Sequence, residues 1–184
     1  MTRRARQALK IDVLVESDRW QNVKTAGAIV RRAVMRAAAA LSTSPTELAV
    51  VLTDDPAIRA LNRNWRGIDT ATNVLSFATK NAAGRHLGDI VLAYETIARE
   101  ARRDRKPFAH HLAHLAVHGF LHLVGYDHHH DDNALAMEDA ERAILWELRI
   151  PDPYRARGRN NVRHRARQPA KHDGRGAARI ASRA

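Results

Sequence analysis

The chain has 184 residues and a formal net charge of +11, with 45% hydrophobic and 5% aromatic residues. This length predicts one domain with a tail, and the apolar fraction is sufficient for a packed, mostly aliphatic core. The absence of cysteine excludes disulfides and cysteine-ligated metals, which leaves histidines and carboxylates as the possible metal ligands.

Apolar periodicity in the first half of the chain predicts two strands and two helices. The strands are expected at 9–15, where apolar and polar residues alternate, and at 47–54, where a continuous apolar run favours a central strand. A helix with one apolar face is expected from 20 to 41. A shorter helix begins at Asp55–Pro56, which supply an N-cap and an early proline, and ends near Trp65.

The second half of the chain predicts a pair of strands and three helices. The strands, at 72–79 and 87–94, are separated by a turn-like segment and could form a hairpin. The helices are expected at 95–104, at 108–124 with Gly125 just past its end, and from Asp131 or Asp132 to the residue before Pro151. Because strands and helices mix without strict alternation, the predicted fold class is α+β.

Most of the positive charge lies at the C-terminal end. Residues 154–184 contain ten arginines or lysines and a single acidic residue, so this tail carries +9 of the net +11. We expect residues 1–153 to form the folded domain and the tail, which lacks apolar periodicity, to be disordered. Such a basic tail typically contacts nucleic acid or another polyanion. A solubilising tail without a specific partner is the alternative.

No apolar run approaches the roughly 20 residues that a membrane helix requires. The N-terminus is basic, but the apolar stretch that follows is short and contains Asp12 and Glu16, unlike a secretory signal. We therefore expect a soluble, cytoplasmic protein with no membrane partner.

Histidines recur every four residues on the predicted helix 108–124, at His110, His114, His118 and His122. Two histidines one turn apart are separated by about 6 Å along the axis, and a third would lie about 12 Å away. Because zinc–nitrogen bonds are only about 2.0–2.1 Å long, such a helix can offer two ligands to one ion. A third ligand must come from the chain after Gly125.

The spacing of His118, His122 and His128, with Gly125 between the last two, matches the zinc-protease pattern H-E-x-x-H-x-x-G-x-x-H. Three neutral imidazoles suit one zinc ion and leave a fourth position open, which is typical of a catalytic site. The alternative is that the two helical histidines are satisfied core residues and 128–130 is a solvated loop. Further candidates to orient a ligand histidine or to contact substrate are Asp127, Asp89 and His114.

Gly119 occupies the position of the protease glutamate, which serves as general base. Peptide hydrolysis by that route is therefore closed. A phosphodiester has an anionic transition state, for which electrostatic stabilisation counts most. The glycine is also expected to remove bulk beside the metal, which could admit a phosphate group.

Three segments resemble the YbeY family of bacterial rRNA-maturation endoribonucleases. They are "LNRNWRGIDTATNVLSF" (61–77), "LGDIVLA" (87–93) and "HGFLHLVGYDH" (118–128), and the resemblance extends over about residues 9–150. One departure is Ala78, where the family usually has proline.

The resemblance implies an α+β fold in which a small mixed four-stranded sheet packs against several helices. It implies one zinc per chain, held by His118, His122 and His128 at the end of the long histidine-bearing helix. It further implies single-strand-specific RNA cleavage in 16S rRNA 3′-end maturation and ribosome quality control, with ribosomal RNA and the small ribosomal subunit as partners. The family's functionally important arginine falls on Arg66, which could bind a phosphate in bidentate fashion.

Two other functions stay open. A non-catalytic, RNA-binding ribosome-assembly factor with a structural zinc predicts a fourth protein ligand, such as Asp127 or His114. A metal-dependent hydrolase of another substrate, such as a peptidase, is disfavoured by Gly119 and by the basic tail. The sequence leaves open the oligomeric state, the general base and the choice between water and the ribose 2′-hydroxyl as nucleophile.

Overall fold

The computed structural model describes residues 9–41, 47–79, 86–127 and 131–154. The chain divides into two compact units, Met1–Asp152 and Pro153–Ala184. The elements below all belong to the first unit. Residues 155–184 of the tail lie outside the described residues, so the disorder expected for the tail stays a prediction.

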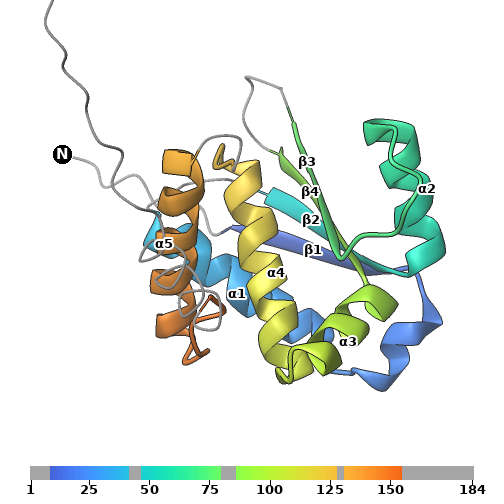
Figure 1. The fold of residues 1–184 in the computed structure, drawn as a ribbon, viewed down its shortest axis with the longest axis horizontal. Helices are drawn as coiled ribbons and strands as arrows, with labels where there is room; N and C mark the ends of the chain where they lie inside the picture. The colour runs from blue at the N-terminus through green and yellow to red at the C-terminus, as the bar shows by residue number, and fades with distance from the viewer. Residues whose placement is uncertain (1–8, 42–46, 80–85, 128–130, 155–184) are drawn as a thin grey trace, which may run out of the picture. The chain divides into compact units, whose positions relative to one another are not determined.

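Four strands form one mixed sheet in the order β1-β2-β4-β3 (Figure 1). The inner strand β2 (Glu47–Thr53) pairs in parallel with β1 (Lys10–Val15) on one side and with β4 (His86–Ala93) on the other. The edge strand β3 (Val74–Ala78) is antiparallel to β4. The α+β class, the central position of the second strand and the antiparallel pairing of the last two are thereby confirmed.

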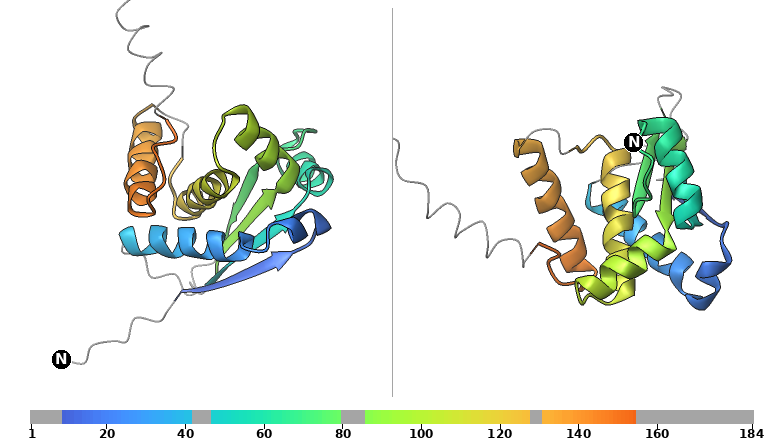
Figure 2. Two further views of the ribbon diagram at one scale, coloured as in Figure 1. Left: turned by 90° about the horizontal axis from the view of Figure 1, so that it is seen from below. Right: turned by 45° about the vertical axis from the view of Figure 1, so that its right-hand side comes forward.

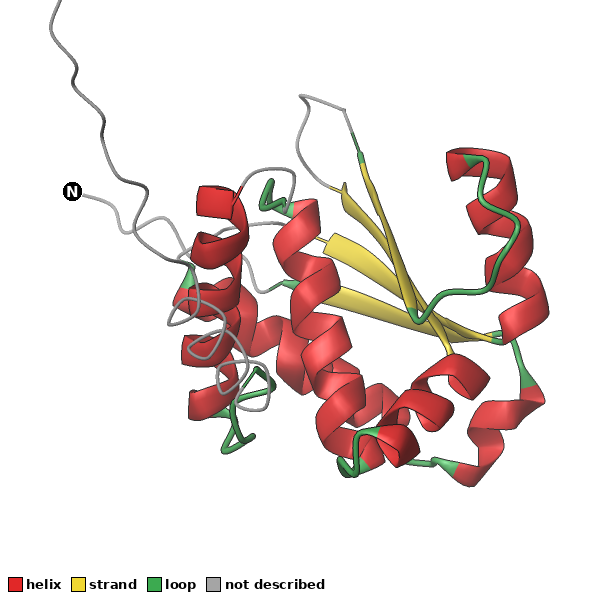
Figure 3. Ribbon diagram, viewed as in Figure 1, coloured by secondary structure: helices red, strands yellow, loops and turns green. Residues whose placement is uncertain are grey.

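Five α-helices lie among the described residues and cover the two faces of the sheet (Figure 3). They are α1 (Ala26–Ala40), α2 (Asp55–Arg66), α3 (Tyr94–Arg103), α4 (Phe108–Leu123) and α5 (Asp131–Glu147). In this part of the chain, none of the helices is long and apolar enough to cross a membrane.

The helix expected from 20 to 41 is wrong at its start. A 3₁₀ helix, η1 (Asp18–Asn22), precedes α1 and is separated from it. Trp20 lies on this 3₁₀ helix and is buried in the core, where its indole N–H donates to the Thr53 carbonyl at 2.8 Å. Its spacing from the apolar residues of α1 therefore looks helical in the sequence, although Trp20 is not part of that helix.

The start of α2 also differs from the expectation. The N-cap is Asp54, whose carboxylate accepts a hydrogen bond from the Ala57 N–H at 3.1 Å. The Asp55 carboxylate instead accepts from the backbone N–H of Thr96, on α3, at 3.0 Å. The Asp55 side chain thus serves the N-terminal end of another helix, where unpaired N–H groups favour an anion.

The two faces of the sheet carry separate cores. Along β4, Ile90 and Leu92 pack into the core shared with α1, α4 and α5, whereas Val91 and Ala93 pack with Ile58 of α2. Successive side chains of a strand point to opposite faces. Helices α4 and α2 therefore lie on opposite sides of the sheet, as Figure 2 also shows.

Candidate metal centre

The last turns of α4 place His118 and His122 side by side. Their Nε2 atoms are 3.2 Å apart, and their ring centroids are separated by 4.7 Å. Both residues are partly buried. Two imidazoles one helical turn apart thus converge on a single point, as the sequence spacing predicts.

The other nitrogen of each ring has a hydrogen-bond acceptor. His118 Nδ1 lies 2.6 Å from Glu141 Oε1, and His122 Nδ1 lies 2.9 Å from the Tyr126 carbonyl oxygen. A carbonyl and an ionised carboxylate only accept, so each Nδ1 carries the proton. In the neutral rings the two Nε2 lone pairs therefore face one another.

This arrangement fits two ligands of one cation. Two nitrogens bound at about 2.0–2.1 Å in a tetrahedral site lie about 3.3–3.4 Å apart, close to the observed 3.2 Å. Two facing lone pairs repel each other unless a cation or a proton lies between them. His128 lies outside the described residues, and among the described ones no group of three or more potential ligands is placed to hold a metal. The zinc ion and its third ligand stay predictions.

The turn after α4 fixes His122. Gly125 has a φ of +96°, the left-handed conformation expected just past the helix end. The Tyr126 N–H then bonds back to the Leu121 carbonyl at 3.0 Å. This reversal directs the Tyr126 carbonyl at His122, so the glycine of the motif has a structural role in orienting the His122 ring.

Glu141 is a residue of the site that the sequence motifs do not identify. It lies on α5, is 0% exposed, and binds both His118 and His114, whose Nε2 is 2.9 Å from Oε2. Burial raises the pKa of Glu141, but the hydrogen bonds from the two histidines outweigh burial and lower it from 4.5 to about 2. The signal was a carboxylate on the apolar stripe of Met137, Ile144 and Leu145, all buried.

Three other candidates are distributed around the site. His114 faces Glu141, with its ring centroid 6.4 Å from that of His118, and so lies behind the histidine pair. Asp127 accepts a hydrogen bond from the Asn133 side chain at 3.1 Å.

Asp89 lies on the other face of the sheet. Its carboxylate pairs with His86 at 3.0 Å. It occupies a β4 position between Gly88 and Ile90, so its side chain faces α2 rather than α4. The last placement separates Asp89 from the histidine pair.

Arg66 is the last residue of α2 and is exposed. Its guanidinium forms no hydrogen bond or ion pair with the residues that the structure describes. Because α2 packs on the face opposite α4, Arg66 is separated from the histidine pair by the edge strand β3. An RNA strand that contacts both Arg66 and the histidine pair would therefore have to cross the edge of the sheet at β3.

The expected role of Gly119 is wrong. A Cβ atom there would lie 2.8 Å from Ile90 Cγ2, 3.1 Å from Ser76 Oγ and 3.4 Å from Val74 Cγ2. The space beside the glycine is filled by the sheet and is not open to a phosphate. Gly119 instead permits α4 to approach β3 and β4 closely, and Ser76 Oγ donates to its carbonyl at 3.1 Å.

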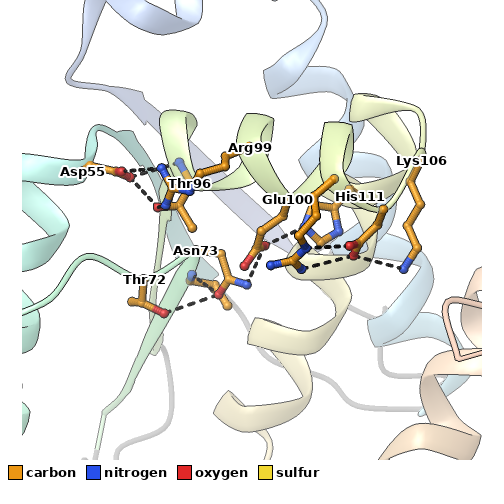
Figure 4. Close-up of polar contacts among 11 residues, drawn as sticks. Asp55, Thr72, Asn73, Thr96, Arg99, Glu100, Lys106 and His111 are labelled. Atoms are coloured by element: carbon orange, nitrogen blue, oxygen red, sulfur yellow. Dashed lines mark hydrogen bonds and ion pairs between the residues drawn. The ribbon is translucent and has the colours of Figure 1, made fainter. Parts of the chain in front are cut away.

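A polar cluster at the other end of α4 fixes this helix to the edge strand (Figure 4). Glu100 Oε2 accepts from Asn73 Nδ2 at 2.9 Å and lies 2.8 Å from His111 Nε2. Asn73 immediately precedes β3, and His111 lies in the first turn of α4 and is 7% exposed. One carboxylate therefore ties α3, the start of β3 and the first turn of α4 together.

Glu100 should contribute stability that depends on pH. Burial raises its pKa, but hydrogen bonds from His111 and Asn73 outweigh burial, so the pKa is lowered. A lowered folded-state pKa stabilises above the unfolded-state value of about 4.3, and the contribution is lost as pH falls below it. Urea unfolding should show that Glu100→Gln costs about 1–3 kcal/mol at pH 7 and less at pH 4. The exposed Glu16→Gln is the control, and an equal cost at both pH values would contradict the assignment.

These features define an α+β protein with a histidine-based candidate metal centre on a buried helix. A family model described as "Endoribonuclease YbeY" matches residues 14–149. A Bradyrhizobium diazoefficiens protein of that name is 54% identical over 153 residues, which cover 78% of this chain and 84% of that protein. A Rhodopseudomonas palustris (strain BisB18) protein of the same name is 54% identical over 159 residues, covering 82% and 95%. The chain belongs to the Endoribonuclease YbeY family.

A solution structure of a Thermotoga maritima protein was also matched. It is 24% identical, with a TM-score of 0.48, and the match covers 91% of this chain and 99% of that one.

Proposed function

We propose that this protein is a zinc-dependent endoribonuclease that cleaves single-stranded RNA and acts in 16S rRNA 3′-end maturation and ribosome quality control. The observation that carries the proposal is the pair of facing Nε2 atoms, 3.2 Å apart, whose rings are held from behind by Glu141 and the Tyr126 carbonyl. The relatives' name, Endoribonuclease YbeY, supports RNA as the substrate.

The chain's own residues have distinct tasks in this proposal. His118, His122 and His128 hold the metal, which when bound supplies a Lewis acid and lowers the pKa of bound water. Glu141 keeps the proton of His118 on Nδ1, so that Nε2 is available as a ligand. Arg66, exposed and without an ion pair among the described residues, binds an RNA phosphate. The basic tail, residues 154–184, adds sequence-independent attraction to rRNA.

The assembly-factor alternative requires a closed metal site. His114 is a poor fourth ligand because its Nε2 is engaged by Glu141 rather than directed at the histidine pair. This contact disfavours His114 as the closing ligand, so the assembly-factor alternative would need Asp127 in the fourth position.

Metal content and RNA cleavage measured together test the proposal. Wild type should carry about one zinc per chain and cut single-stranded RNA that ends in a precursor 16S 3′ extension. His122→Ala should lose both properties. Arg66→Glu should keep the zinc and lower kcat/KM for cleavage by about 10- to 100-fold, because it removes a charged contact to the RNA backbone and adds a like charge. The matched control is Arg63→Glu, one turn earlier on α2, which should cleave nearly as well as wild type.

The outcomes separate the functions. If zinc binds but wild type and His122→Ala cleave equally, the measured activity comes from elsewhere and the assembly-factor function is favoured. If Arg66→Glu cleaves normally, the phosphate-binding role of Arg66 is wrong while the metal site stands.

A further inference from the structure

Trp65 is a large aromatic residue that the fold leaves uncovered. Its relative exposure is 72%, whereas Trp20 is 2% exposed and belongs to the core. The Trp65 ring lies against Phe77 of β3, with centroids 5.7 Å apart and planes inclined by 59°. Ile68, which is 51% exposed, follows after the helix end. These two exposed apolar side chains beside charged residues make the C-terminal end of α2 a candidate interaction surface.

Trp65 lies at the same level of the sheet as the histidine pair. Ser76 and Phe77 are neighbours on the edge strand, so their side chains point to opposite faces. Ser76 contacts the Gly119 carbonyl, between His118 and His122 in sequence, and Phe77 contacts Trp65. A second contact places the last turn of α4 beside the same part of the sheet. Gly88 pairs with Ala78, and a Cβ atom on Gly88 would lie 3.0 Å from Leu123 Cδ2. In Figure 1 the C-terminal ends of α2 and α4 lie on either side of β3.

Charge favours nucleic acid as the occupant of this surface. Arg66 follows Trp65 directly and has no ion pair with a described residue. An exposed aromatic ring next to a free guanidinium is the pairing that single-stranded RNA uses, because bases stack on the ring while the cation binds the backbone. A partner protein would engage Arg66 only where it presents a carboxylate or an aromatic ring.

We propose that Trp65 is a stacking platform for an unpaired base of the RNA substrate, with Arg66 on an adjoining phosphate. The strand then crosses the edge at β3 and brings a phosphate a few nucleotides away to the histidine pair. Because bases in a duplex are already stacked and paired, Trp65 engages single strands selectively. The inference rests on the proposed function, to which it adds a source of single-strand preference.

Equilibrium binding to full-length protein tests this role apart from cleavage. In the His122→Ala background, the affinity for a labelled single-stranded oligoribonucleotide and for the matching duplex is measured by fluorescence anisotropy. Trp65→Ala should weaken single-strand binding by about 10-fold, as expected for loss of one stacked base, and leave duplex binding unchanged. Trp65→Phe should restore most of the affinity. Trp146→Ala is the control, since Trp146 is 81% exposed on α5.

Cleavage kinetics in the otherwise wild-type chain give a second measurement. Trp65→Ala should raise KM by a similar factor, with kcat and the thermal midpoint close to those of wild type. Unchanged single-strand affinity, or equal losses for single strand and duplex, would overturn the stacking role and leave a protein partner as the occupant. If wild type binds through Trp65 but does not cleave, the proposed activity fails and the stacking role stands.

Discussion

Glu141→Gln is expected to weaken zinc binding by about 10- to 100-fold while leaving the protein folded. The carboxylate accepts from Nδ1 of His118 and from Nε2 of His114 with no exposure to water. Glutamine retains the shape and one acceptor oxygen, but it removes the negative charge that makes His118 a more basic ligand. With a pKa of about 2, Glu141 is ionised throughout the range from pH 6 to 8, so the loss should be the same at both limits.

Competition with a chromophoric chelator measures this affinity without reference to activity. Glu138→Gln is the matched control, because Glu138 lies one turn earlier on α5 and pairs with Arg142 rather than with a histidine. Glu141→Leu, in contrast, leaves two buried N–H groups without their acceptor, at about 1–3 kcal/mol each, and should lower the urea midpoint strongly. Equal zinc affinity for Glu141→Gln and Glu138→Gln would show that Glu141 holds the fold but not the metal ligand.

Much of the fold follows from local pattern. The strands at 9–15 and 47–54 are found within one residue at each end, as β1 and β2. The helix expected at 108–124 is α4, and Gly125 has the left-handed φ expected beyond it. These elements depend on periodicity and on a single backbone constraint, both of which are properties of consecutive residues. The start of α1 was misplaced because Trp20 packs through tertiary contacts that no local pattern contains.

The candidate site, like the fold, could be predicted only where it depends on consecutive residues. Spacing along one helix predicts the convergence of His118 and His122, since helical geometry alone determines it. The group that orients His118 comes from α5, more than twenty residues later, and only the packing of α5 on α4 identifies it as Glu141. Asp89 was a candidate because it follows a glycine in a strand. The side chains that it can contact depend on which face of the sheet it occupies, and this follows from the packing of helices on the sheet rather than from local sequence. In the structure Asp89 faces away from the histidines.

Gly119→Glu, which restores the glutamate of the zinc-protease pattern, should abolish folding rather than create a peptidase. The Cβ atom alone would lie 2.8 Å from Ile90 Cγ2, and the carboxylate would enter a packed interface with no cationic partner among the residues that contact this position. Overpacking costs about 1–3 kcal/mol and an unpaired buried charge several more, against a total stability of about 5–15 kcal/mol. Circular dichroism and soluble yield measure the outcome, and a folded, peptidase-active variant would contradict it.

Gly119→Ala isolates the steric part of this effect. Alanine has a higher helix propensity than glycine by about 1 kcal/mol. Gly119→Ala should therefore stabilise the protein if the site has room for a methyl group. It should destabilise the protein if the clash with Ile90 costs more than this gain. Gly27→Ala is the matched control on α1, because a Cβ there meets Arg31 Nη1 at 3.5 Å and Val13 Cγ1 at 3.8 Å, ordinary contact distances. We expect Gly27→Ala to stabilise by up to about 1 kcal/mol and Gly119→Ala to destabilise. In an Ile90→Ala background the cost of Gly119→Ala should fall, because the atom that it meets is gone. Additive effects would place the obstruction elsewhere, and the close approach of α4 to the sheet would then have another cause.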